Sequence, residues 1–219
     1  MTLFMATNNP HKKREMAKLL KDHTLFIPSD KNIDFTAEEN GKSFYENSFL
    51  KAKTLWDIVQ HPVLADDSGL CIDALDGIPG IYSARYAGMH YPQGTRDNHS
   101  TSQSEQNNML IEHTTHILHK KYGKKLPTMS KKERMALRSC YYVCAMTLYL
   151  EKDSFYCVQK VFKGQLVEHI NEQRGSNGFG YDPIVYLPEY DKTVAEIPEA
   201  EKNTISHRAK ATNKILTLI

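Results

Sequence analysis

The order of segments in this 219-residue chain predicts a mixed α/β fold. Near the N-terminus, an apolar strand pattern, a polar turn and an amphipathic helix pattern follow one another. A longer helix pattern over residues 42–60 then precedes an apolar run at 63–65. Further along, apolar and aromatic stretches at 140–150 and 155–162 indicate a strand and its hairpin partner. Together these patterns predict a central mixed sheet flanked by helices.

The N-terminal segment predicts a strand–turn–helix unit. Residues 2–6 read as a strand and residues 7–10 as a polar turn. Pro10 suits the first turn of a helix, in which Met16, Leu19 and Leu20 recur at helical spacing. Residues 24–27 then predict a second strand.

The next segment predicts a long helix and two short strands. Five apolar residues recur at i, i+4, i+7, i+11 and i+14, which predicts an amphipathic helix: Tyr45, Phe49, Ala52, Trp56 and Val59. Residues 63–65 read as a buried strand. We expect a turn at Ser68-Gly69 and another strand at 70–75.

The C-terminal third predicts strands, a glycine loop and a closing helix. Gly164-Gln165 indicates a turn into a strand at 166–170, and residues 184–187 form a strand pattern between prolines. Residues 175–180 contain three glycines and predict a loop. The chain ends on a helical pattern formed by Ile205, Ala209, Thr212, Leu216 and Ile219.

Length and composition favour one globular domain spanning residues 1–219. Hydrophobic residues make up 40% of the chain and charged residues 25%, and the net charge is +2. We expect a peripheral polar and basic lobe at about 88–139. Between His119 and Arg134, seven residues are basic against one acid, Glu133: Lys120, Lys121, Lys124, Lys125, Lys131, Lys132 and Arg134. A solvated face or mobile arm is the default interpretation, and phosphate or nucleic-acid contact is the alternative.

The cysteines and the apolar runs indicate the cellular compartment in which the protein is expected. Four cysteines form no C-x-x-C pair and lie in apolar surroundings, so we expect buried free thiols in a reducing compartment: Cys71, Cys140, Cys144 and Cys157. We expect no signal peptide, and no apolar run approaches the ~20 residues of a membrane span. A cytoplasmic protein without a membrane partner is the resulting expectation.

Asp66 and Asp67 stand side by side where an apolar run ends. Adjacent carboxylates repel unless a cation or hydrogen-bond donors offset their charge. Neighbouring residues of a strand point to opposite faces, so only one carboxylate should face a ligand. We expect Asp67 to do so and Asp66 to hold the following turn or a supporting position. A solvated Asp-Asp-Ser-Gly turn is the alternative.

Three other segments carry groups suited to an anionic, flat ligand. Residues 7–12 join a strand to a helix N-terminus and add Lys12, which favours an anion. The loop at 175–183 places Phe179 between glycines, where its ring could stack on a flat group. Residues 201–208 supply several donors that could bind carbonyl oxygens or phosphates. Each also has an ordinary explanation: an N-cap turn, a glycine-rich hairpin and a solvated helix face.

Six motifs in order resemble one known family, the inosine triphosphate pyrophosphatases, also called dITP/XTP pyrophosphatases. They are Thr7-x-Asn9-x-x-Lys12, Glu46-Asn47-x-x-x-Lys51-Ala52, Ala65-Asp66-Asp67-Ser68-Gly69-Leu70, Gly80-Ile81-Tyr82-Ser83-Ala84-Arg85-Tyr86, Gly178-Phe179-Gly180-Tyr181-Asp182-Pro183 and Glu201-Lys202-Asn203-x-x-Ser206-His207-Arg208. The resemblance implies an elongated mixed sheet with helices, in two lobes around a nucleotide cleft, and a homodimer. It implies Mg²⁺-dependent hydrolysis of ITP, dITP and XTP to a monophosphate and pyrophosphate.

The resemblance also assigns roles by position. It implies that Glu39 and Asp67 bind the metal and that Asp67 accepts a proton. The implied substrate contacts are Thr7, Asn9, Lys12, Lys51, Ser68, Phe179, Gly180, Tyr181, Asp182, Lys202, His207 and Arg208. Of these, residues 7–12 would hold the triphosphate, and Phe179 to Asp182, Lys202, His207 and Arg208 the base. Asn8 departs from the family pattern, where glycine is frequent.

Two alternatives follow from the same residues. One is a Maf-type nucleotide pyrophosphatase acting on other modified nucleotides, which a substrate panel separates. The other is a non-catalytic nucleic-acid-binding protein that uses the basic segment 119–134, for which binding should depend steeply on salt. Because the second explains none of the carboxylates, nucleic acid is the weaker expectation.

Overall fold

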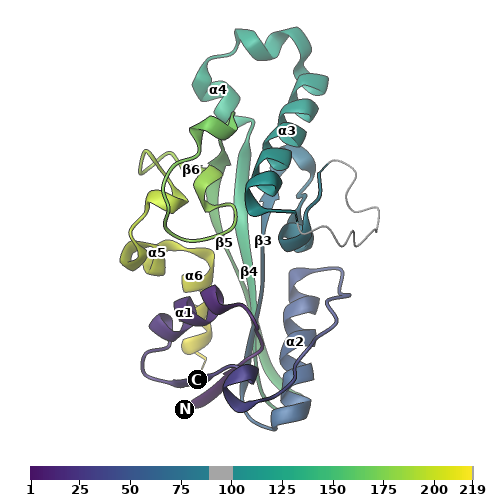
Figure 1. Ribbon diagram of the computed structural model, residues 1–219, viewed down its shortest axis with the longest axis vertical. Coiled ribbons are helices and arrows are strands. Elements are labelled where there is room, and N and C mark those ends of the chain that lie inside the picture. Colours follow the sequence, from purple (N-terminus) through teal and green to yellow (C-terminus); the bar gives the residue numbers. More distant parts are fainter. Residues whose placement is uncertain (89–100, 219) are drawn as a thin grey trace. The chain divides into compact units, whose positions relative to one another are not determined.

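The computed structural model describes residues 1–88 and 101–218 (Figure 1). Seven strands form one sheet in the order β2-β1-β3-β4-β5-β6-β7. β1 pairs in parallel with β2 and with β3, whereas β6 is antiparallel to β5 and to β7. The predicted mixed α/β class is therefore confirmed. The strands are β1 Thr2–Met5, β2 Thr24–Phe26, β3 Val63–Ile72, β4 Ser139–Glu151, β5 Ser154–Leu166, β6 Val185–Leu187 and β7 Lys192–Thr193.

The chain divides into two compact units. Unit 1 comprises 1–68, 143–161 and 203–219, and unit 2 comprises 69–142 and 162–202. Strands β3, β4 and β5 each contribute residues to both. The segment expected to form a peripheral lobe, 88–139, belongs to unit 2, and its residues 89–100 lie outside the described part of the chain.

Unit 1 has helices on both faces of its strands. The helices are α1 Pro10–Leu19, α2 Phe44–Val59 and α6 His207–Leu216. Side chains alternate along β1, so that Leu3 and Met5 pack with α1 and α6, while Phe4 and Ala6 pack with α2 (Figure 1). Two apolar layers therefore hold the strands between helices, and the predicted helices at 10–20 and 42–60 are confirmed.

β3 continues through the position where a turn was expected. The prediction of two strands separated by a Ser68-Gly69 turn is wrong, because Val63–Ile72 is one strand, and nine of its ten residues are buried. The apolar run 63–65 resembles a complete short strand because the residues after it are acidic. Their charges are compensated inside the fold, so the strand continues.

β5 likewise continues through Gly164. The prediction of a turn at Gly164-Gln165 and a strand at 166–170 is wrong, since Ser154–Leu166 is one strand. A Cβ added at Gly164 would lie 2.7 Å from Cγ1 of Val185 on the adjacent strand. The glycine therefore permits close approach of β6 rather than a turn.

The C-terminal helical pattern is divided in two. α5 spans Glu199–Ile205 and α6 spans His207–Leu216, so the predicted closing helix is confirmed as α6, and Ile205 belongs to the helix before it. Ser206 caps α6, because its Oγ accepts a hydrogen bond of 3.1 Å from the N–H of Ala209. The break places His207 and Arg208 in the first turn of a new helix.

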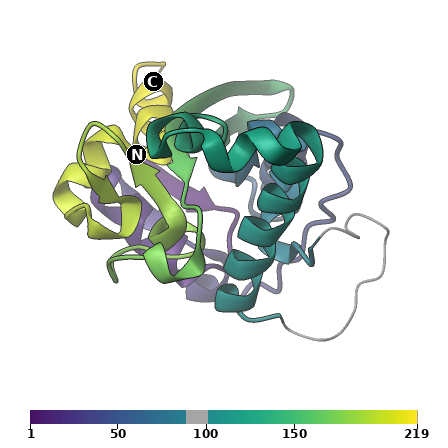
Figure 2. The same ribbon diagram turned by 90° about the horizontal axis from the view of Figure 1, so that it is seen from above.

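Unit 2 contains the longest described helix, α3 Gln103–Tyr122, followed by α4 Lys131–Ala136 (Figures 1 and 2). Part of the basic segment is paired within this unit. Arg134 makes two hydrogen bonds to Glu168, of 2.7 and 3.1 Å, and Lys131 lies 3.1 Å from Glu172. This pairing favours an ordinary charged face over a polyanion site.

Among the residues placed by the structure, no helix is long and apolar enough to cross a membrane. Cys71, Cys140 and Cys144 are buried free thiols, as expected, whereas Cys157 is partly exposed.

Candidate functional site

The turn before α1 is shaped by its own side chains. Asn9 is the N-cap, and its Oδ1 accepts hydrogen bonds from the N–H groups of His11 (2.9 Å) and Lys12 (3.3 Å). Oγ1 of Thr7 accepts from the N–H of Asn9 at 3.1 Å. Asn8, the position that departs from the family pattern, donates to the carbonyl of Phe35 at 3.1 Å. The result is a formed helix N-terminus, which favours an anion.

Asp66 and Asp67 point to opposite faces of β3, as expected for strand neighbours. Asp66 contacts α1 and α6: Lys12 Nζ lies 3.0 Å away, and Nε and Nη2 of Arg208 each donate at 3.2 Å. Ser68 Oγ also donates to Asp66 at 2.5 Å. Asp66 therefore does hold Ser68, but along a continuous strand and not in a turn.

Asp67 contacts the side of α2. Lys51 Nζ lies 2.8 Å from Oδ1 of Asp67 and 3.2 Å from Oε1 of Glu39. Asn47 Nδ2 donates to the other oxygen of Asp67 at 3.3 Å. Glu39 and Asp67, the two expected metal ligands, thus converge on one ammonium group.

The two neighbouring carboxyls differ in acidity. Burial raises the pKa of Asp66, but Lys12 and Arg208 outweigh it and hold that pKa well below the usual range. Burial raises the pKa of Asp67, Lys51 opposes this, and Glu39 adds to it, so that the net shift is upward. Asp66 is therefore a permanent charge, whereas Asp67 is the more basic of the two.

A hard divalent cation fits the pair Glu39 and Asp67. Mg²⁺ keeps much of its water and usually takes one or two carboxylates plus substrate phosphates. Both carboxylates contact the ammonium group of Lys51, at 2.8 Å from Asp67 and 3.2 Å from Glu39, and they supply the oxygen ligands that Mg²⁺ requires. Larger metal-binding groups, with three or more His, Cys, Asp or Glu side chains, do not occur in residues 1–88 and 101–218.

Arg208 is a structural cation of unit 1. It is 2% exposed, and its Nη1 donates to Glu15 at 2.6 Å while the rest of the guanidinium contacts Asp66 and Ser68. Burial lowers the pKa of Arg208, and Asp66 and Glu15 more than offset this, so the group stays charged. His207, which precedes it, is buried in the same unit.

Sequence reasoning missed two residues of this network. Asn47 lies four positions before Lys51, so both occupy one face of α2, and that spacing was a usable signal. Glu15 lies one turn after Lys12 and next to the buried Met16, but nothing local identifies its partner, which is 193 positions away.

The predicted base-binding loop lies in unit 2. Unit 2 contains five of the expected base contacts: Phe179, Gly180, Tyr181, Asp182 and Lys202. Asp182 accepts hydrogen bonds from Lys202 Nζ (2.6 Å) and from the N–H of Phe179 (2.9 Å). Lys202 Nζ also lies 5.6 Å from the centre of the Phe179 ring. The structure therefore brings these residues together, whereas the other two expected base contacts, His207 and Arg208, belong to unit 1.

The glycine at position 178 is required by this arrangement. Gly178 has a φ of +83°, and a Cβ there would lie 2.1 Å from Oδ2 of Asp182. The loop therefore packs directly on the Asp182 carboxylate, and Phe179, the residue expected to stack on a base, is partly exposed.

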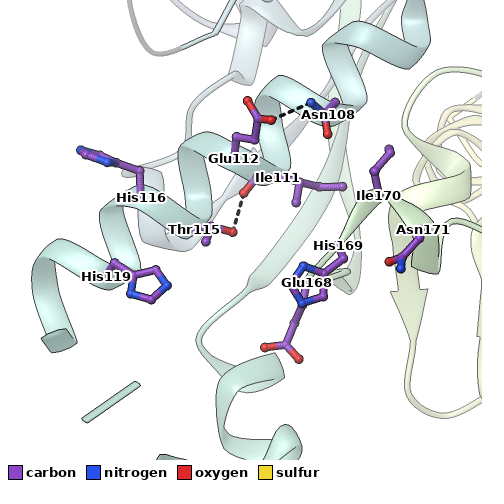
Figure 3. A pocket seen from close by; sticks show the side chains of 10 residues that line it. All are labelled: Asn108, Ile111, Glu112, Thr115, His116, His119, Glu168, His169, Ile170 and Asn171. Atoms are coloured by element: carbon purple, nitrogen blue, oxygen red, sulfur yellow. Dashed lines mark hydrogen bonds between the residues drawn. The ribbon is translucent and has the colours of Figure 1, made fainter. Parts of the chain in front are cut away.

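A separate cavity of about 740 Å³ lies in unit 2 (Figure 3). Its walls come from α3 and from residues 168–171, and His119 and His169 face each other across it. None of the sequence-predicted site residues lines it. The cavity is therefore distinct from the phosphate and base segments.

Comparison with known proteins decides the family. The profile of the Ham1 family matches residues 3–218. The chain belongs to the Ham1 family. This membership favours the pyrophosphatase resemblance over the Maf-type alternative.

Curated relatives and solved structures agree with the Ham1 assignment. A dITP/XTP pyrophosphatase of Treponema denticola is 39% identical over 211 residues, covering 96% of this chain and 94% of the relative. One from Legionella pneumophila strain Lens is 39% identical over 220 residues, covering 99% and 97%. The structure of a HAM1 protein from Coxiella burnetii matches with a TM-score of 0.78 and 31% identity, covering 100% and 98%.

Proposed function

We propose that this Ham1-family chain hydrolyses the non-standard purine nucleoside triphosphates dITP, ITP and XTP to the monophosphate and pyrophosphate. The names of the Treponema and Legionella relatives support this reaction class. The observation that carries it is the convergence of Glu39 and Asp67 on Lys51, on the face of β3 opposite Asp66 and Lys12. A cleansing role for the nucleotide pool follows from that substrate class.

The triphosphate would be held by unit 1. The N-terminus of α1, capped by Asn9, supplies a positive dipole end, Lys12 and Lys51 supply charge, and Thr7 and Asn9 are candidate contacts. Ser68, which is half-buried beside Asp66, is a further candidate for substrate contact. Because Lys12 lies 3.0 Å from the buried Asp66 carboxylate, its ammonium group is held in place.

Asp67 is the proposed proton acceptor. In the reaction, water attacks the α-phosphorus, the bond from that phosphorus to the oxygen bridging to the β-phosphate breaks, and pyrophosphate leaves. The proton of the water passes to Asp67, whose raised pKa makes it a better base than an ordinary aspartate.

Glu39 and Asp67 would hold Mg²⁺, which when bound neutralises phosphate charge. The assignment to Mg²⁺ rests on the oxygen chemistry of the pair, and titration with EDTA followed by a panel of divalent cations tests it.

The base would be read by the Phe179 loop of unit 2, with Gly180, Tyr181, Asp182 and Lys202. Hypoxanthine and xanthine carry a 6-keto oxygen, which accepts a hydrogen bond, whereas the 6-amino group of adenine donates one. Donors such as Lys202 therefore favour the keto bases, because a mismatched buried donor costs roughly 1–3 kcal/mol.

A homodimer and a cytoplasmic location are part of the same proposal. The first rests on the family resemblance and the second on the free thiols. Sedimentation of the purified chain tests the dimer.

The deciding experiment measures pyrophosphate release from dITP, ITP, XTP, GTP and ATP, with and without Mg²⁺. We expect release from the first three, dependent on the metal, and weak release from ATP. Equal turnover of all five would contradict selectivity for non-standard purines, and release from none of them would contradict the reaction itself.

A further inference from the structure

The carboxylate of Asp182 is held from three different elements of unit 2. Tyr142, on β4, donates its hydroxyl to Oδ1 at 3.0 Å. Oδ2 accepts from Lys202 on α5 at 2.6 Å and from the backbone N–H of Phe179 at 2.9 Å. One oxygen therefore faces the sheet, and the other fixes the two groups expected to contact a base.

This arrangement is buried and leaves little freedom. Asp182 is 4% exposed, Tyr142 7% and Lys202 8%. Burial raises the pKa of Tyr142 well above its usual value, and the nearby Asp182 adds to the effect, so the hydroxyl keeps its proton and remains a donor. Without that donor, Oδ1 of Asp182 would lose the hydrogen bond that it accepts from the sheet. The carboxylate could then rotate about the Cβ–Cγ bond.

Rotation of Asp182 would disturb the loop at two points. Oδ2 carries both the Lys202 ammonium and the N–H of Phe179, so both would lose their anchor. The packing at Gly178, where even a Cβ would lie 2.1 Å from Oδ2, shows how closely the loop follows this carboxylate. Tyr181, by contrast, is anchored separately, because its hydroxyl donates to the carbonyl of Ser83 at 2.8 Å.

We propose that Tyr142 is a positioning residue for base recognition: its hydroxyl orients Asp182 and thereby sets Lys202 and Phe179 for a purine. Tyr142 lies outside the six motifs that carry the family resemblance. The inference rests on the proposed function, since it assigns a part in reading the base of that substrate. It predicts that Tyr142 affects affinity for the base and not the hydrolytic step in unit 1.

The test is Tyr142→Phe, which removes one oxygen and keeps the ring in the core. We expect KM for dITP to rise about tenfold, the effect of losing one hydrogen bond to a charged group, with kcat within about twofold of wild type. The inhibition constant of inorganic tripolyphosphate, which has no base, should not change. A general loosening of the structure would instead weaken both ligands.

Tyr141→Phe is the matched control, because Tyr141 is the adjacent tyrosine on β4 and its hydroxyl lies beside the Cys71 thiol instead of Asp182. We expect wild-type KM for this variant. A double-mutant cycle with Asp182→Asn shows whether Tyr142 acts through that carboxylate. In the Asp182→Asn background, Tyr142→Phe should add little, and additive effects would overturn the inference.

Direct binding separates this inference from the proposed reaction. Calorimetric titration with dITP and with ATP, in Ca²⁺ in place of Mg²⁺, measures base affinity whether or not hydrolysis occurs. If the wild-type chain releases no pyrophosphate, the proposed reaction is contradicted. If Tyr142→Phe nevertheless binds dITP more weakly than the wild type, the role of Tyr142 is still supported. Unchanged dITP affinity in Tyr142→Phe would overturn the inference even in an active enzyme.

Discussion

The charged groups of unit 1 and the loop of unit 2 are built in opposite ways. In unit 1 most of the charged groups lie on regular elements, α1, α2, β3 and α6, and pair across them at 2.6–3.2 Å, with Glu39 on the segment before α2 as the exception. In unit 2 the candidate base contacts lie on a glycine loop whose position depends on one carboxylate, Asp182. Under the proposed function, unit 1 supplies fixed charges for the chemistry, and unit 2 supplies a loop, anchored on one carboxylate, for contact with the base.

The largest effect should come from Asp67→Asn. The amide keeps the size of the side chain but cannot accept the proton, so we expect pyrophosphate release from dITP to fall by about a thousandfold. The melting temperature should fall moderately, because the substitution removes the ion pair with the buried Lys51, while Glu39 still contacts that ammonium group at 3.2 Å.

Asp57→Asn is its control, because Asp57 is an exposed acid on α2 that pairs with Lys53. It should release pyrophosphate at the wild-type rate. Turnover near wild type by Asp67→Asn would remove Asp67 from the chemistry.

Removal of Arg208 should test whether the unit 1 network is structural. Arg208→Met leaves Asp66 and Glu15 buried without their shared cation, and breaking a buried pair in this way costs about 3–5 kcal/mol. Urea unfolding measures the loss. Arg14→Met, at an exposed position of α1, is the control, and equal stability of the two variants would contradict the network's structural role.

Phe179→Ala should change binding and leave stability nearly unaltered. Stacking of a base on an aromatic ring contributes roughly 1–3 kcal/mol, so KM for dITP should rise about tenfold to a hundredfold. Phe155→Ala removes an exposed ring from unit 1 and should leave KM unchanged. If the two variants have the same KM, Phe179 does not contact the base.

The smallest effect should appear in the pH dependence of kcat/KM. Because burial raises the pKa of Asp67, its carboxyl is protonated at a higher pH than an ordinary aspartate, whose pKa is 3.8. Activity requires the ionised form, so it should decline, as pH falls, through a pKa above 3.8. A decline centred below 3.8 would show that Lys51 outweighs burial. Asp66, with its lowered pKa, should not contribute to this limb.

Local errors in the predicted fold share one physical cause. The Ser68-Gly69 and Gly164-Gln165 pairs have turn composition, yet both lie inside strands. At the first, Lys12 and Arg208 compensate Asp66 and Lys51 compensates Asp67; at the second, β6 needs a neighbour without a side chain. In each case a tertiary contact outweighed the local preference of the residues.

The sequence by itself determined the mixed α/β class, the opposite orientations of Asp66 and Asp67, and the segments that carry the candidate site, because strand alternation, helical spacing and turn chemistry are local. Only the tertiary structure decided how the charges pair. Glu15 meets Arg208 across 193 positions, and Tyr142 meets Asp182 across 40. Such pairs depend on which faces pack together, and burial then makes their charges strong enough to set the acidity of Asp66 and the orientation of the Phe179 loop.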